Sequence, residues 1–144
     1  MQNQDTILLL KECDAGSKMA VSSIDDVLDH IHDTTLKALM EKSKRHHTKL
    51  GNTIHVLLNQ YGAEDKDPNP MAKGMSWMKT NWKMSMDGSD HTIADLMTDG
   101  CNMGIKSLYK YMNQYPAAEQ KVIDLCTDLI EIEEELRRDL RDYL

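Results

Sequence analysis

Residues 35–61 read TLKALMEKSKRHHTKLGNTIHVLLNQY, and the spacing of side chains along this stretch decides the fold. One set of positions recurs every three or four residues and is apolar except near its middle: Leu36, Leu39, Ser43, His47, Leu50, Ile54, Leu57 and Tyr61. This period places the whole set on one face of an α-helix. The stretch therefore predicts an amphipathic helix over about 35–61, with Gly62 as its carboxyl-terminal cap.

The residues before this stretch repeat its pattern. From about Asp5 to His32 the recurring positions are Ile7, Leu10, Ser17, Val21, Ile24, Leu28 and Ile31, again with a small polar residue near the middle. Asp33 and Thr34 then form a short corner. We therefore expect the two helices to pack as an antiparallel hairpin.

The residues after Gly62 predict a break followed by a short helix. The most polar part of the chain, about 62–69, is expected to be a linker. Asn69 and Pro70 suit the start of a helix, because proline lacks only an N–H that would be unpaired there. A connector helix is therefore predicted over about 70–86, ending at the Asp87–Gly88 break.

A second pair of long helices follows. Ser89 or Asp90 can cap a helix that runs to about Gln114, and Tyr115–Pro116 starts the next, over about 116–143. The apolar face of this last helix comprises Val122, Leu125, Leu129, Ile132, Leu136 and Leu140. The sequence predicts an all-α four-helix bundle, made of two hairpins joined by a crossover that contains a short connector helix. An up-down-up-down bundle is the alternative.

Length and composition set limits on the function. A chain of 144 residues fits a single domain, 1–144, and a net charge of -7 argues against nucleic acid as a partner. Three cysteines without paired spacing argue against a disulfide framework or a zinc site. No apolar run approaches the roughly 20 residues that span a bilayer, and no basic cluster precedes the short apolar run near the amino terminus. We therefore expect a cytoplasmic protein without a membrane partner.

Two stretches carry a resemblance to a known family: residues 69–78, NPMAKGMSWM, and residues 91–105, in which HTIADLM is followed by GCNMGI. In these stretches the chain resembles small bacterial members of the ferritin-like superfamily, especially four-helix proteins of anaerobic Firmicutes. The resemblance covers nearly the whole chain. It implies a ferritin-like bundle, and it implies no particular activity.

The residues that bind metal in ferritin-like relatives are largely replaced. The resemblance implies a third-helix Glu shortly before Tyr109, but the matching residue is Asn102. His47 matches a metal-binding His of the second helix, yet Lys44 stands three positions before it in place of a Glu. We therefore interpret the site as degenerate and expect no cofactor.

One alternative assignment keeps a metal. His47, Asn102, Asp128 and Glu131 come from three predicted helices at comparable depth and could form a rebuilt site for a single divalent ion. This would make the chain a divergent metal-binding protein or oxidoreductase. We expect instead that Asp128 and Glu131 face water, as does the charged run 131–139.

The middle of the bundle is predicted to be narrow and partly polar. His47 needs a hydrogen-bond partner if it is buried, and Ser17 and Ser43 are the candidates. Small residues at Gly16, Ala20, Gly100, Gly104 and Ser107 either let helices approach closely or leave a cavity for a small molecule. Close packing is the favoured interpretation.

The connector segment predicts contact with another protein. Its large apolar residues recur at helical spacing and comprise Met71, Met75, Trp77, Met78 and Trp82. A methionine stripe of this kind is more often core or interface than a metal site. The sequence therefore favours a non-catalytic bundle that acts through protein association, as a homodimer. No nucleophile motif, phosphate loop or zincin motif favours an enzyme.

Overall fold

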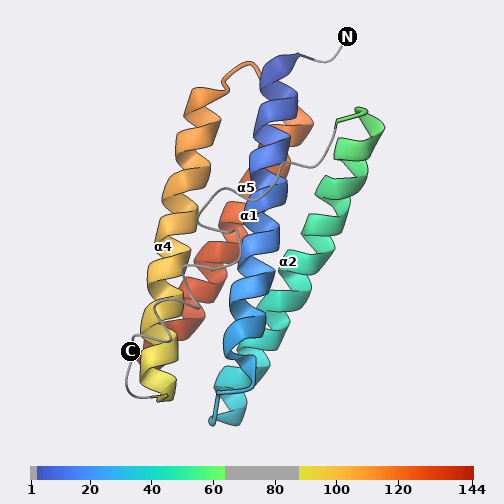
Figure 1. Ribbon diagram of the computed structural model, residues 1–144. Helices are drawn as coiled ribbons and strands as arrows, with labels where there is room; N and C mark the ends of the chain where they lie inside the picture. The colour runs from blue at the N-terminus through green and yellow to red at the C-terminus, as the bar shows by residue number, and fades with distance from the viewer. Residues whose placement is uncertain (1–2, 64–87) are drawn as a thin grey trace.

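A computed structural model describes residues 3–63 and 88–144, which form an all-helical bundle (Figure 1). The described residues contain the long helices α1 (Gln4–Leu28), α2 (Thr34–Gln60), α4 (Asp90–Gln114) and α5 (Gln120–Asp139), the 3-10 helix η1 (Leu140–Tyr143), and no strand. None of these helices has both the length and the apolar character needed to cross a bilayer. The connector helix expected at about 70–86, and the linker from residue 64 onward, lie outside the described ranges.

Short polar residues begin three of the helices, and the sequence predicts one of these caps, Ser89. Asn3, Asp33 and Ser89 each accept a hydrogen bond from a backbone N–H three residues later. At the end of α2, Gly62 has a φ of 69°, a conformation that glycine adopts without steric cost. The N–H of Ala63 donates to the carbonyl of Leu58, which completes the predicted cap.

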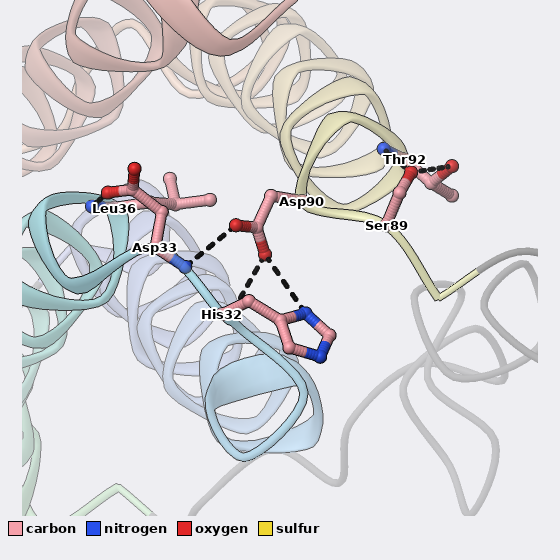
Figure 2. A network of polar contacts seen from close by, with 6 residues as sticks. All are labelled: His32, Asp33, Leu36, Ser89, Asp90 and Thr92. Carbon is pink, nitrogen blue, oxygen red and sulfur yellow. Dashed lines mark hydrogen bonds and ion pairs between the residues drawn. The ribbon is translucent and has the colours of Figure 1, made fainter.

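The corner between α1 and α2 is joined to the start of α4 by one carboxylate (Figure 2). Asp90 accepts hydrogen bonds from the backbone N–H groups of His32, at 2.8 Å, and Asp33, at 2.7 Å. Because these N–H groups bond to α4, the chain leaves the helical path early, and α1 ends at Leu28 rather than at the predicted His32.

The opposite end of the bundle is held in a similar way. The N–H of Ala117 donates to Asp5, and the N–H of Glu119 donates to the hydroxyl of Thr6. These contacts hold the corner after α4 against α1 in a non-helical path. Helix α5 therefore begins at Gln120, later than the predicted Pro116.

Each hairpin packs beside the other. α1 contacts α2 and α4, and α5 contacts α2, α4 and α1 (Figure 1). The hydroxyl of Tyr61, at the end of α2, donates to Glu119, at the start of α5, over 2.6 Å. Since α2 ends beside the α4–α5 corner and α4 begins beside the α1–α2 corner, α2 and α4 run in the same direction.

The core consists of two apolar clusters with a polar layer between them. One cluster lies toward the α4–α5 corner and includes Leu9, Leu58 and Val122; the other lies toward the α1–α2 corner and includes Ile24, Met40 and Leu136. Between them the buried polar residues include Ser17, Ser43, His47 and Glu133. All three cysteines are buried and none forms a disulfide. The polar middle of the bundle predicted for the first two helices is therefore confirmed.

Candidate functional site

Side chains from all four long helices line a cavity of about 110 Å³ at the level of the polar layer. α1 and α4 supply most of the wall, and the small residues among them include Ala15, Gly16, Ala20, Gly100, Gly104 and Ser107. α2 contributes His47 and α5 contributes Glu133. Protein interiors are normally close-packed, so a cavity of this size is a candidate site.

Gly16 of α1 and Gly104 of α4 leave room that a larger residue would occupy. A Cβ on Gly104 would lie 3.7 Å from the carboxyl group of Glu133, and one on Gly16 would lie 3.9 Å from Leu129. Both are ordinary van der Waals distances, so neither glycine is required by a close approach. The expected close packing is therefore not found at these two positions. It occurs between α1 and α2, where a Cβ on Gly51 would stand 3.0 Å from the hydroxyl of Ser17.

The most strongly polar feature of the cavity wall is the contact between His47 and Glu133. The Nε2 atom of His47 lies 2.7 Å from Oε1 of Glu133, and its Nδ1 atom lies 2.8 Å from the backbone oxygen of Ser43. His47 is fully buried and Glu133 is 9% exposed. Ser43 is thus one of the two partners predicted for His47, whereas the hydroxyl of Ser17 donates to the carbonyl of Asp14.

Electrostatics favour the protonated form of His47. Burial alone would lower the pKa of His47, but the hydrogen bond and the charge of Glu133, together with the Ser43 carbonyl, raise it above its ordinary value of 6.5. Burial, followed by the charge of Glu133, raises the pKa of the neighbouring Cys101 far above its usual range. Cys101 is therefore a thiol at neutral pH and not a nucleophilic thiolate.

The structure does not bring the four candidate metal ligands together. His47 is buried, whereas Asn102, Asp128 and Glu131 are exposed. Asn102 accepts a hydrogen bond from Arg137 over 2.9 Å, and a Cβ on Gly104 would face Glu133, so this part of α4 lies beside residues of α5 that follow Asp128 and Glu131. The corner between α4 and α5 is longer than predicted, which moves the facing residues along α5. Within residues 3–63 and 88–144, no three His, Cys, Asp or Glu side chains are grouped for a metal ion.

Sequence reasoning missed Glu133, which belongs to the run 131–139 that was expected to be solvated. The buried positions of α5 include Leu129, Glu133 and Leu136, and the buried Leu140 of η1 continues their regular helical spacing. This spacing was a usable signal: a carboxylate in a core position needs a partner, and a histidine at a core position of another helix is the natural one. Its neighbours Glu131 and Arg138 are exposed, as predicted.

The predicted interface residues Met71, Met75, Trp77, Met78 and Trp82 lie outside the described residues. The candidate site is therefore the cavity, with a carboxylate–imidazole pair on a wall that is otherwise mainly small and apolar. Such a wall can enclose a largely apolar guest and form a hydrogen bond with one polar group on that guest. Comparisons of the chain with protein-family models, with curated proteins and with solved structures find no match.

Proposed function

We propose that this chain binds a small, largely apolar molecule inside the bundle, with the pair of His47 and Glu133 as the polar anchor. The observation that supports this is a buried carboxyl group on the wall of a partly open cavity between the helices. Burying a polar or charged group lowers the stability of a fold unless the group is paired. A pocket with mainly apolar walls and a few such groups is typical of a ligand site, where the polar groups orient the guest.

The volume of the cavity limits the size of the guest. An apolar cavity of about 150 Å³ takes up benzene, and the cavity here measures about 110 Å³. A guest of roughly five or six non-hydrogen atoms therefore fits. Met19 and Met103 are partly buried and line the cavity. Because methionine side chains adapt their shape readily, they can adjust to guests of different outline.

The proposal is tested by filling the cavity. Titration of the isotope-labelled chain with n-pentane, followed by NMR, is expected to shift the amide signals of residues on the cavity wall. Gly104→Leu should abolish these shifts and leave the fold intact, because the added side chain occupies the cavity. Lys106→Leu places the same side chain at an exposed position of α4 and should leave binding unchanged.

Two results would contradict the proposal. One is an unchanged spectrum at saturating n-pentane. The other is a Gly104→Leu variant that is destabilised by about 1–3 kcal/mol, the cost of overpacking a core that has no room.

We further propose that the bundle has ferritin-like connectivity. The common direction of α2 and α4 supports it, because two hairpins joined by one long crossover require these helices to be parallel. The proposal concerns connectivity and not metal chemistry, since the exposed positions of Asn102, Asp128 and Glu131 give no support to a metal site.

Association through the segment that contains Met75, Trp77 and Trp82 remains a prediction from the sequence. Light scattering on the wild type and on Met75→Glu, Trp77→Ala and Trp82→Ala variants tests it. We expect a dimer that dissociates in the variants. A monomer at every concentration, unaffected by these changes, would exclude it.

A further inference from the structure

His47 and Glu133 hold one proton between them. The carbonyl oxygen of Ser43 can only accept a hydrogen bond, so the Nδ1 atom of His47, 2.8 Å away, must carry a hydrogen. The contact of 2.7 Å between Nε2 and Oε1 of Glu133 also needs a proton, which sits either on the imidazole or on the carboxyl group. In both arrangements the pair has no net charge.

The described residues of the cavity wall include no lysine or arginine that could meet an acidic guest. The charge of Arg137 acts to lower the pKa of Cys101, so this cation is near the cavity. Its guanidinium group, however, donates a hydrogen bond to Asn102 at the surface. Among the described residues, an anionic guest would therefore meet the carboxyl group of Glu133 and no lysine or arginine.

Glu133 retains the capacity to accept a hydrogen bond from a guest. Its Oε1 atom is engaged by His47, while Oε2 lies 3.7 Å from the place that a Cβ on Gly104 would occupy. The polar group of α4 beside this carboxylate is the Cys101 thiol, and a thiol is a weak donor. A hydroxyl group placed in the cavity is a stronger donor than the thiol.

We propose that the cavity selects an uncharged guest that donates one hydrogen bond to Glu133, which is the chemistry of a small aliphatic alcohol. This inference rests on the proposed function, because it names the ligand class for the same cavity. A hydroxyl group on the guest adds no charge and leaves the hydrogen bond between His47 and Glu133 intact. An ammonium ion adds a charge that the pair does not compensate, and a carboxylate faces the carboxyl group of Glu133.

The experiment compares four probes of similar length at pH 7: n-pentane, 1-butanol, n-butylammonium and butyrate. Dissociation constants are measured by NMR titration of the full chain. In a purely apolar cavity 1-butanol would bind more weakly than n-pentane, because its hydroxyl group loses water without replacement. Here we expect 1-butanol to bind at least as tightly as n-pentane, and both ions to bind at least roughly tenfold more weakly than 1-butanol.

Variants of Glu133 show whether this residue is responsible. Glu133→Met removes the acceptor and should weaken 1-butanol binding by roughly tenfold or more while n-pentane binding is kept. Glu131→Met makes the same change at an exposed position of α5 and should leave all constants unchanged. Glu133→Gln keeps an oxygen acceptor and can donate to His47, so it tests the inference even if Glu133→Met does not fold. Its 1-butanol affinity should stay within about threefold of the wild-type value.

The outcomes separate the inference from the function on which it rests. If n-pentane binds but 1-butanol binds more weakly, the cavity is a ligand site and the proposed selectivity is wrong. Butyrate or n-butylammonium binding as tightly as 1-butanol also overturns it, as does a loss of roughly tenfold or more in Glu133→Gln. If n-pentane does not bind either, the proposed function and the inference both fail.

Discussion

At the scale of single residues, the contact between His47 and Glu133 makes stability depend on pH. The pKa of His47 is raised in the folded protein, against burial, by Glu133 and by the Ser43 carbonyl. A raised pKa means that the folded state binds the proton more tightly than the unfolded state does. The stabilisation is therefore complete below the ordinary pKa of 6.5 and is lost as pH rises through the folded value.

This dependence can be measured by urea unfolding over a series of pH values. We expect the wild type to lose stability above about pH 6.5, with the loss levelling off once His47 is neutral in both states. Glu133→Gln removes the main cause of the raised pKa and should flatten this part of the profile. Glu131→Gln, an exposed change on the same helix, should keep the wild-type slope. A wild-type profile that rises across the same range contradicts the assignment.

Asp14 is a second buried charge, and Lys18 compensates it. The carboxylate of Asp14 is 1% exposed, with Lys18 Nζ at 2.9 Å and the ring of His55 at 3.7 Å. Neither carboxylate oxygen accepts a directed hydrogen bond from the described residues, so the ionic contact itself compensates the charge. Lys18→Met should therefore lower the free energy of unfolding by about 1–3 kcal/mol, because it leaves a buried carboxylate with a weaker partner.

Chemical denaturation of a matched pair of variants checks this prediction. Lys44 forms an ion pair with Asp25 in which the side chains are 38% and 49% exposed, so neither charge is buried. Lys44→Met should therefore change stability by less than about 0.5 kcal/mol. Equal effects of the two substitutions would show that the burial of Asp14 does not matter.

At the scale of elements, Asp90 joins three helices through one side chain. It stands in the first turn of α4 and accepts the N–H groups of His32 and Asp33 at the α1–α2 corner (Figure 2). Asp90→Ala removes two charge-assisted hydrogen bonds and a favourable charge at a helix amino terminus. We expect a loss of about 1–3 kcal/mol in thermal or urea unfolding. Asp95→Ala, at an exposed position of the same helix, should cost close to nothing, and a comparable cost there would argue against the role of Asp90.

Element boundaries were predictable where the signal is local. The Ser89 cap and the Gly62 terminator depend on a few adjacent residues, and the structure has both as predicted. The ends of α1 and α5 depend on contacts from distant residues, Asp90 in one case and Asp5 and Thr6 in the other. Such contacts are not visible in the sequence near the boundary, so the predicted end of α1 was too late and the predicted start of α5 was too early.

The candidate site was predictable only in part for the same reason. His47 could be placed on a core face from its own helix, and its burial is confirmed. Its pairing with Glu133 depends on how α2 and α5 are aligned, which the helical period alone does not determine. The small residues of α1 and α4 were also recognised. Whether they close together or leave a cavity depends on the distance between two helices, and therefore on the packing of the whole bundle.

At the scale of the whole molecule, the two hairpins are joined by polar contacts at both ends of the bundle. Asp90 binds the α1–α2 corner at one end. At the other end, Tyr61 donates to Glu119 and Asn3 donates to the carbonyl of Ala117. Two apolar clusters between these ends contain residues of both hairpins. Each hairpin thus presents the other with a complementary surface that does not depend on a peptide bond between them.

It follows that the bundle should assemble from two separate polypeptides, residues 1–63 and residues 88–144. Each alone exposes its apolar face and should show little helix by circular dichroism, and mixing them should restore the helical signal with a stoichiometry of one to one. Full helicity of either fragment alone, or no gain on mixing, would rule this out. The folded state would then follow the law of mass action, with a midpoint of unfolding that rises with concentration, and the fragments would behave as a receptor and its ligand.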